Sequence, residues 1–139
     1  SYALVSETGR YAITRVWLTG DRRNLKERLV ENLPGFPDDL SISPRGTVWV
    51  ALSSLRSSAL DFAHAYPFIK DSYAGLPRLL QLHAAPYGLV VELDATGRPL
   101  RSFHDAGGER FRDVSAVVED GGVLLFGSMS GAAVGRLVL

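Results

Sequence analysis

Short segments in which apolar and polar residues alternate run along most of this 139-residue chain, and turn residues separate them. An alternation of period two places successive side chains on opposite faces of a strand, whereas a helix needs a period near 3.6. About ten segments have ordinary strand length, which is typical of an all-β architecture. The segments that we expect to form strands are 2–7, 11–18, 27–32, 39–43, 47–52, 87–94, 99–105, 114–120, 122–128 and 133–139.

One stretch, residues 57–84, departs from this pattern. Its apolar residues recur at helical spacing, and Pro67 and Pro77 would divide it into short helices. Because it is too long for a hairpin loop, we interpret it as a helical insertion. Long insertions between strands are often lids or binding loops.

The composition excludes several classes of function. Lys plus Arg and Asp plus Glu both number 15, and a nucleic-acid-binding protein normally has a basic excess. The chain has no cysteine, so disulfides, thiolate zinc sites and cysteine nucleophiles are excluded. No leader and no run of 18 apolar residues is present, and neither observation assigns a compartment.

A weak repeat indicates the kind of all-β fold. Residues 40–54 and 116–130 share a pattern of strand, glycine turn and strand, with Gly46 and Gly121 in the turns. Without the insertion, the two turns are about 45 residues apart, the length of a four-stranded propeller blade. The strands then group as three, four and three, or about two and a half blades. Such an arc would expose two apolar faces, so we expect further polypeptide or a second subunit to complete the ring.

Particular motifs support this interpretation and resemble one family. The motifs are NLPGFPDDLS, GTVWVAL, ALDFAHAYPFIK, YGLVVELDATGRPLRSFHD and EDGGVLLFGS. Together they resemble the C-terminal half of strictosidine-synthase-like proteins, in the adipocyte plasma-membrane-associated branch. The resemblance covers residues 1–139. It implies a partial six-bladed β-propeller whose short helical insertion caps a central pocket, related to the calcium-dependent esterases and lactonases of the regucalcin and paraoxonase group.

The resemblance also bears on individual residues. The catalytic glutamate of strictosidine synthase precedes a turn that corresponds to EDGG here, and Ser115 stands in its place. In the calcium-dependent relatives the aspartate of a PDG motif binds the metal. Here PDD places Asp38 at that position, with Asp39 where those relatives have glycine. Asp38 is therefore the expected Ca²⁺ ligand; alternatively, Asp38 or Asp39 caps a turn after Pro37.

Further residues are candidates for a pocket around this site. Ser115 and Asp39 are candidate catalytic residues, although Ser115 could equally be a pocket wall, since no Gly-x-Ser-x-Gly motif is present. Glu7 could be a pocket carboxylate or could pair with Arg10 or Arg15. The remaining candidates for a substrate pocket suited to a mostly apolar ligand are Asp113, Phe62, His64, Tyr66 and Phe68, although the insertion's aromatic residues could instead pack it onto the ring.

Several other residues are given structural interpretations. No two histidines have zinc-ligand spacing, and a structural hydrogen bond suits His104 better than catalysis. Trp17 and Trp49 are predicted in the core, and Arg101 on a solvated edge. Basic residues in the insertion are too few to predict contact with a membrane.

These residues support three functional hypotheses. The first is a calcium-assisted hydrolase of the lactonase or arylesterase type, acting on a small, mostly apolar ester or lactone. The second is a non-catalytic ligand-binding or scaffold propeller, favoured by the missing glutamate. The third, condensation of an amine with an aldehyde, is disfavoured because Ser115 replaces that glutamate.

Overall fold

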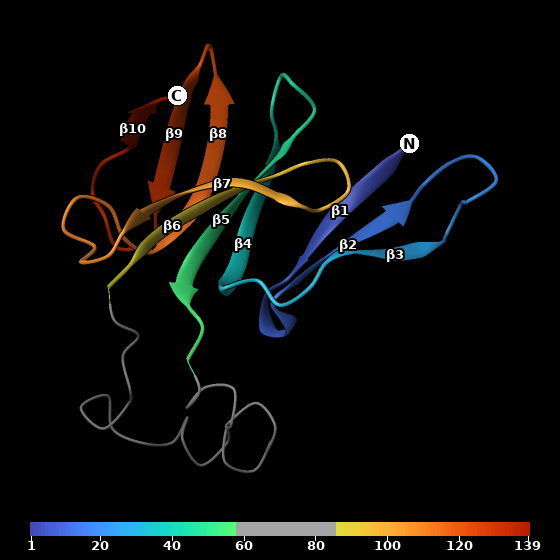
Figure 1. Ribbon diagram of the computed structural model, residues 1–139, viewed down its shortest axis with the longest axis horizontal. Helices are drawn as coiled ribbons and strands as arrows, with labels where there is room; N and C mark the ends of the chain where they lie inside the picture. The colour runs from blue at the N-terminus through green and yellow to red at the C-terminus, as the bar shows by residue number, and fades with distance from the viewer. Residues whose placement is uncertain (58–85) are drawn as a thin grey trace.

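The chain folds into three antiparallel sheets that follow one another across the molecule (Figure 1). A computed structural model describes residues 1–57 and 86–139. The expected helical insertion therefore lies, from residue 58 on, outside the described residues. The described part is all-β, and its sheets contain three, four and three strands, as the sequence predicted.

The strands have the following bounds. The first sheet contains β1 (Tyr2–Glu7), β2 (Ala12–Trp17) and β3 (Lys26–Val30), with a short 3-10 turn, η1 (Thr8–Arg10), after β1. The middle sheet contains β4 (Gly35–Ile42), β5 (Val48–Leu55), β6 (Gly88–Leu93) and β7 (Pro99–Asp105). The last sheet contains β8 (Val114–Asp120), β9 (Val123–Ser128) and β10 (Gly135–Val138).

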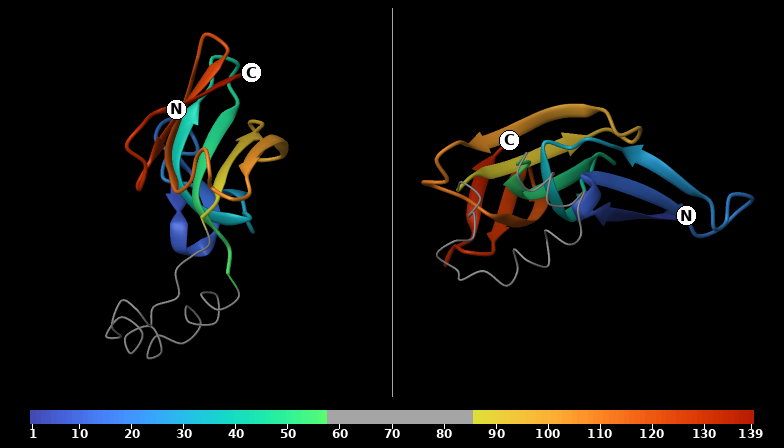
Figure 2. Two further views of the ribbon diagram at one scale, coloured as in Figure 1. Left: turned by 90° about the vertical axis from the view of Figure 1, so that its left-hand side faces the viewer. Right: turned by 90° about the horizontal axis from the view of Figure 1, so that it is seen from below.

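The first strands of the three sheets lie next to one another. β4 contacts both β1 and β8. Seen from below (Figure 2, right), the middle sheet separates the first sheet from the last. In each sheet the later strands follow outward in chain order. This arrangement is that of a partial β-propeller, in which first strands line the axis and last strands form the rim.

Two glycines make the hairpins that begin the second and third sheets. Gly46 lies between β4 and β5 with φ +80°, and Gly121 lies between β8 and β9 with φ +54°. Residues with a Cβ rarely adopt these values, so glycine suits both turns. The repeat seen in the sequence is thus a pair of equivalent hairpins.

β4 begins four residues earlier than the sequence predicted. Pro37 pairs with Leu52 of β5, so Asp38 and Asp39 lie inside the strand. The alternative in which they cap a turn after Pro37 is wrong. Pro37 is tolerated here because β4 is the edge strand of its sheet. On the open side of β4 no neighbouring strand needs the N–H that proline lacks.

The joint between the first two sheets is apolar. Ile13 of β2 is completely buried in a cluster with Leu52 of β5 and Leu89 of β6, and Leu4 of β1 packs against it. Side chains of one parity on each strand face this cluster, as period-two alternation requires. Burial of these aliphatic side chains is the main force holding the first sheet to the second.

The joint between the middle and last sheets combines apolar packing with buried charge. Trp49 of β5 is completely buried beside Val117 and Leu124 of the last sheet. Its indole N–H donates to an Oε2 of Glu119 at 2.6 Å. Trp49 is thus in the core, as predicted, whereas Trp17 lies half-buried at the end of β2.

Arg45, in the β4–β5 turn, connects two buried carboxylates at this joint. Its guanidinium donates to Glu119 Oε2 at 2.8 Å and to Glu92 Oε1 at 3.0 Å. Glu92 and Glu119 are only 3% and 6% exposed, respectively. Arg101 donates its Nε–H to Glu92 and lies over the Trp49 ring, and it is exposed on the outer strand β7, as predicted.

The charge network should make folding sensitive to acid. Burial raises the pKa of Glu92, but hydrogen bonds from Thr47, Arg101 and Arg45 outweigh burial and bring it below its ordinary value of 4.5. A lowered pKa contributes stability that is present above about pH 4.5 and is lost as pH falls through the folded-state pKa.

Glu92→Gln tests this dependence. At pH 7 the variant should unfold at lower urea concentration than the parent, because the neutral amide does not match the two guanidinium groups. As the pH falls through the lowered pKa of Glu92, the difference in urea midpoint between variant and parent should narrow, since Glu92 then becomes protonated in the parent too. A difference that stays constant throughout the acid range in which the parent remains folded would contradict the assignment.

The outer faces of the first and last sheets carry exposed apolar side chains. In the last sheet, Val118 pairs with Leu125, and these residues are 47% and 36% exposed. In the first sheet, Val5 is 44% exposed. A sheet normally buries its apolar face. These exposed side chains therefore agree with the predicted apolar faces at both ends of the arc.

Candidate functional site

The predicted aspartate pair occupies a β-bulge on the inner strand of the middle sheet. Pro37 pairs with Leu52 and Leu40 with Val50, so Asp38 and Asp39 together face one residue of β5. A bulge redirects side chains and is common beside active sites. The doublet therefore lies on the axial edge of the arc, where the sequence predicts it.

Hydrogen bonds from both neighbouring sheets fix this bulge. From the first sheet, Ser6 Oγ donates to the carbonyl oxygen of Asp38 at 2.9 Å, and Thr8 Oγ1 donates to that of Pro37 at 2.8 Å. From the last sheet, the N–H of Val117 donates to Asp39 Oδ2 at 3.3 Å. Asp39 thus ties β4 to β8 through its Oδ2.

The carboxylate of Asp38 accepts no comparable hydrogen bond in the described part of the chain. It is half-buried, and it makes no hydrogen bond or ion pair within residues 1–57 and 86–139. A half-buried carboxylate without a donor is a suitable ligand for a hard cation. Asp38 is thus the free acidic group in a bulge whose backbone is otherwise held in place.

The described residues do not form a complete metal site by themselves. Among them, no three His, Asp or Glu side chains gather closely enough to hold an ion. Calcium takes six to eight oxygen ligands. Asp38 therefore fits the chemistry of such a site as one ligand, and the rest of the shell would come from elsewhere.

Ser115 lies in a second bulge, on the inner strand of the last sheet. Val114 pairs with Ser128 and Ala116 with Gly127, so Ser115 is the extra residue on β8. Its hydroxyl makes no hydrogen bond in the described part of the chain, and no base there activates it. The two candidates from the sequence thus lie on adjacent inner strands, each at a bulge.

Asp113 precedes β8 in a left-handed conformation with φ +51°. Its N–H donates to the carbonyl oxygen of Tyr87 at 3.1 Å, and Ser130 Oγ donates to its Oδ2. These contacts hold the entrance to β8. The carboxylate is available to a ligand only in competition with Ser130.

Glu7 lies apart from this group. It is on the face of β1 opposite to Leu4, and it forms ion pairs with Arg28 at 2.6 Å and with Arg10 at 3.2 Å. The hydrogen bond from Thr14, and then the two arginines, lower the pKa of Glu7 against the opposing effect of burial. The predicted pairing with Arg10 is confirmed, whereas Arg15 instead bonds the carbonyl oxygen of Ala95.

The pocket residues predicted in the insertion are not described. Phe62, His64, Tyr66 and Phe68 all lie outside the described residues. Sequence reasoning also missed Ser6 and Thr8, whose roles depend on contacts between sheets. Only their position at the end of an axial strand could have drawn attention to them.

Taken together, three radial sheets, two of which have a bulged inner strand, define the chain as part of a β-propeller. No family model matches the chain. It is 35% identical to adipocyte plasma membrane-associated protein of Rattus norvegicus over 99% of the chain, and 39% identical to that of Salmo salar over 90%. It is 32% identical to protein STRICTOSIDINE SYNTHASE-LIKE 10 of Arabidopsis thaliana over 93% of the chain.

These similarities assign the family. The chain belongs to the strictosidine-synthase-like family. It spans 38%, 32% and 36% of the lengths of these three relatives. In the described part of the chain, no helix has the length and apolar character needed to cross a membrane.

Proposed function

We propose that this chain contributes the axial site of a propeller that hydrolyses small, mostly apolar esters or lactones with the help of Ca²⁺. The observation that carries the proposal is the carboxylate of Asp38, which has no partner among residues 1–57 and 86–139, in a bulge bonded on both sides. A bound Ca²⁺ would polarise the substrate carbonyl and stabilise the negative charge that develops on its oxygen.

The chain's own residues have distinct roles in this proposal. Asp38 supplies one carboxylate oxygen to the ion, and Ser6 and Thr8 hold the bulge that presents it. Asp39 holds β8 against β4, so that Ser115 forms part of the pocket wall. The insertion residues Phe62, His64, Tyr66 and Phe68 would cover the apolar part of the substrate.

Hydrolysis of phenyl acetate and a small lactone by a ring-complete polypeptide containing this chain tests the proposal. EDTA should lower the rate and added Ca²⁺ should restore it. Asp38→Ala should lower the rate at least tenfold and weaken Ca²⁺ binding measured by calorimetry. Asp21→Ala, which removes an exposed acid in a loop, is the matched control. Full hydrolysis both in EDTA and with Asp38→Ala would overturn the proposal.

A non-catalytic ligand-binding or scaffold propeller is the second candidate. It is favoured by Ser115, whose hydroxyl has no activating base within the described residues. Binding without turnover across a panel of esters and lactones would support it. Condensation of an amine with an aldehyde stays last, because it needs a base at position 115.

The exposed apolar faces suggest how the propeller is completed. Val118 and Leu125 at one end and Val5 at the other would be covered in a closed ring. Further polypeptide, such as the longer relatives contain, or a second subunit would supply that cover. A native mass measurement on the purified species separates these two arrangements.

A further inference from the structure

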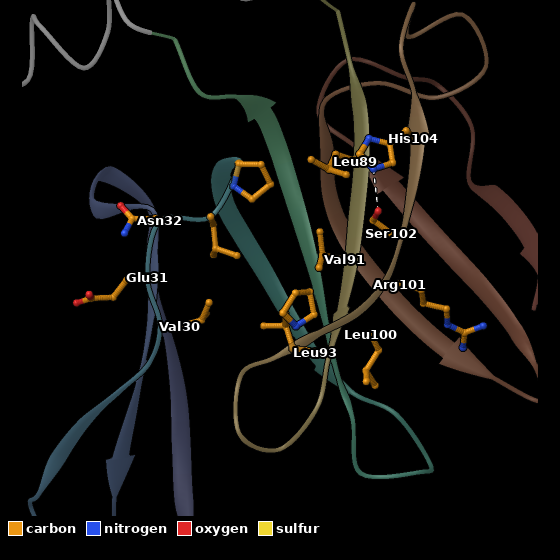
Figure 3. Close-up of a pocket in the computed structure, with 13 residues that line it drawn as sticks. Val30, Glu31, Asn32, Leu89, Val91, Leu93, Leu100, Arg101, Ser102 and His104 are labelled. Atoms are coloured by element: carbon orange, nitrogen blue, oxygen red, sulfur yellow. Dashed lines mark hydrogen bonds between the residues drawn. The ribbon is translucent and has the colours of Figure 1, made fainter.

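A pocket opens at the rim of the molecule, away from the axial site. It lies between the first two sheets and has a volume of about 390 Å³. On one side it is lined by the segment from Val30 to Pro34, and on the other by residues of β6 and β7 (Figure 3). Its floor is aliphatic, formed by Leu89, Val91 and Leu93. A small apolar group can therefore bury itself there.

Ser102 and His104 of β7 lie on the wall of this pocket. They are two residues apart on one strand, so both side chains project from the same face. Ser102 pairs with Val91 and His104 with Leu89, which places both polar side chains beside the apolar floor. Both residues are exposed, so a substrate can reach them.

The two side chains are hydrogen-bonded to each other and to a third group. Ser102 Oγ is 2.8 Å from His104 Nε2, the contact drawn as a dashed line in Figure 3. His104 Nδ1 is 3.0 Å from the hydroxyl of Tyr87, whose ring meets the imidazole edge to face at 5.9 Å. If Nδ1–H donates to Tyr87, Nε2 is free to accept the proton of Ser102.

These distances are those of an activated nucleophile. A serine hydroxyl becomes nucleophilic when a base lies within about 2.6–3.2 Å and a third group orients that base. We propose that Ser102 is a nucleophile activated by His104 and oriented through Tyr87, and that its substrates are small neutral esters whose apolar acyl group enters the rim pocket. The proposal does not depend on the axial site or on a metal ion.

The reaction is acyl transfer to serine followed by hydrolysis. Ser102 Oγ attacks the ester carbonyl carbon while its proton passes to His104 Nε2. The bond from this carbon to the alcohol oxygen then breaks, and the proton on Nε2 passes to the departing alkoxide. Water, deprotonated by Nε2, next attacks the acyl carbon and releases the acid, and the proton returns to Ser102. Because the Tyr87 hydroxyl is uncharged, it should support this cycle less than a carboxylate would.

Covalent labelling of the 139-residue chain tests the proposal. An alkyl fluorophosphonate forms a stable bond to an activated serine, and intact mass followed by peptide mapping should locate one adduct on Ser102. Ser102→Ala should abolish this adduct. His104→Gln should slow labelling at least a hundredfold, since a positioned base contributes about 10²–10⁴ in rate. Tyr87→Phe should slow it less, and EDTA should have no effect.

Ser41→Ala is the matched control. Its hydroxyl has no hydrogen-bond partner among the described residues, so its removal should leave labelling unchanged. Circular dichroism should show that each variant keeps its strands. Three results would each overturn the proposal: labelling that survives Ser102→Ala, an unchanged rate with His104→Gln, or no adduct on a folded parent chain. EDTA-sensitive hydrolysis that is lost with Asp38→Ala but retained with Ser102→Ala would support the axial site alone.

Discussion

Glu119→Ala is expected to lower the free energy of unfolding by about 1–3 kcal/mol, the usual cost of leaving a buried donor without its acceptor. Glu119 is 6% exposed and accepts hydrogen bonds from Arg45 and from the Trp49 indole. Its removal leaves the buried indole N–H without an acceptor and separates Arg45 from the last sheet. Because domains are stable by only about 5–15 kcal/mol, this loss should be visible as a clear shift of the unfolding midpoint to lower urea concentration.

Urea denaturation followed by Trp49 fluorescence measures this effect. Asp120→Ala is the control, since Asp120 is the next residue on β8 and is exposed; it should change stability by less than about 0.5 kcal/mol. Glu119→Gln keeps an acceptor for the indole, so it should be less damaging than Glu119→Ala. Equal stability of the Glu119→Ala and Asp120→Ala variants would show that the network does not hold the joint.

The strands could be predicted because their signals are local. The alternation in residues 114–120 and the glycines at 121 and 122 define β8 and its turn without reference to any other segment. The grouping of the strands also followed, because the inner hairpins of the second and third sheets repeat the same glycine turn. The start of β4 was missed because Pro37 argues locally against a strand, and only its position at an edge makes it acceptable.

The buried charges could not be predicted in the same way. Arg45 and Glu119 are far apart in the sequence and meet only when the last sheet packs on the middle one. Arg101 is an exposed residue of the outer strand, as predicted, but its hydrogen bond to buried Glu92 could not be foreseen. No spacing rule links residues on different sheets, so such contacts depend on the tertiary structure.

The axial candidates were found by resemblance, and the structure adds their geometry. A sequence motif can mark Asp38 and Ser115, but it cannot show that each lies in a bulge on neighbouring strands. It also cannot separate the carboxylate of Asp39, which accepts a hydrogen bond from Val117, from that of Asp38, which accepts none within the part of the chain that the structure describes. The rim pair Ser102 and His104 carries no recognised motif, and its interest comes from measured distances.

The contributions of the two joints to stability should respond differently to acid. The joint between the middle and last sheets contains Glu92, whose stabilising contribution depends on its charge and is lost in acid. The joint between the first and middle sheets is an aliphatic cluster around Ile13, whose contribution does not depend on protonation. Acid should therefore weaken the charge network around Glu92 and leave the contribution of the aliphatic cluster unchanged.

Ile13→Ala tests the apolar joint. Ile13 is completely buried between the first and middle sheets, and replacing such a residue with alanine typically costs about 2–5 kcal/mol through lost burial and a residual cavity. The loss should not depend on pH, in contrast to that of Glu92→Gln. Val5→Ala, on the opposite and exposed face of the first sheet, should have a much smaller effect. If Ile13→Ala and Val5→Ala unfold at the same urea concentration, the first sheet is not held to the arc by this cluster.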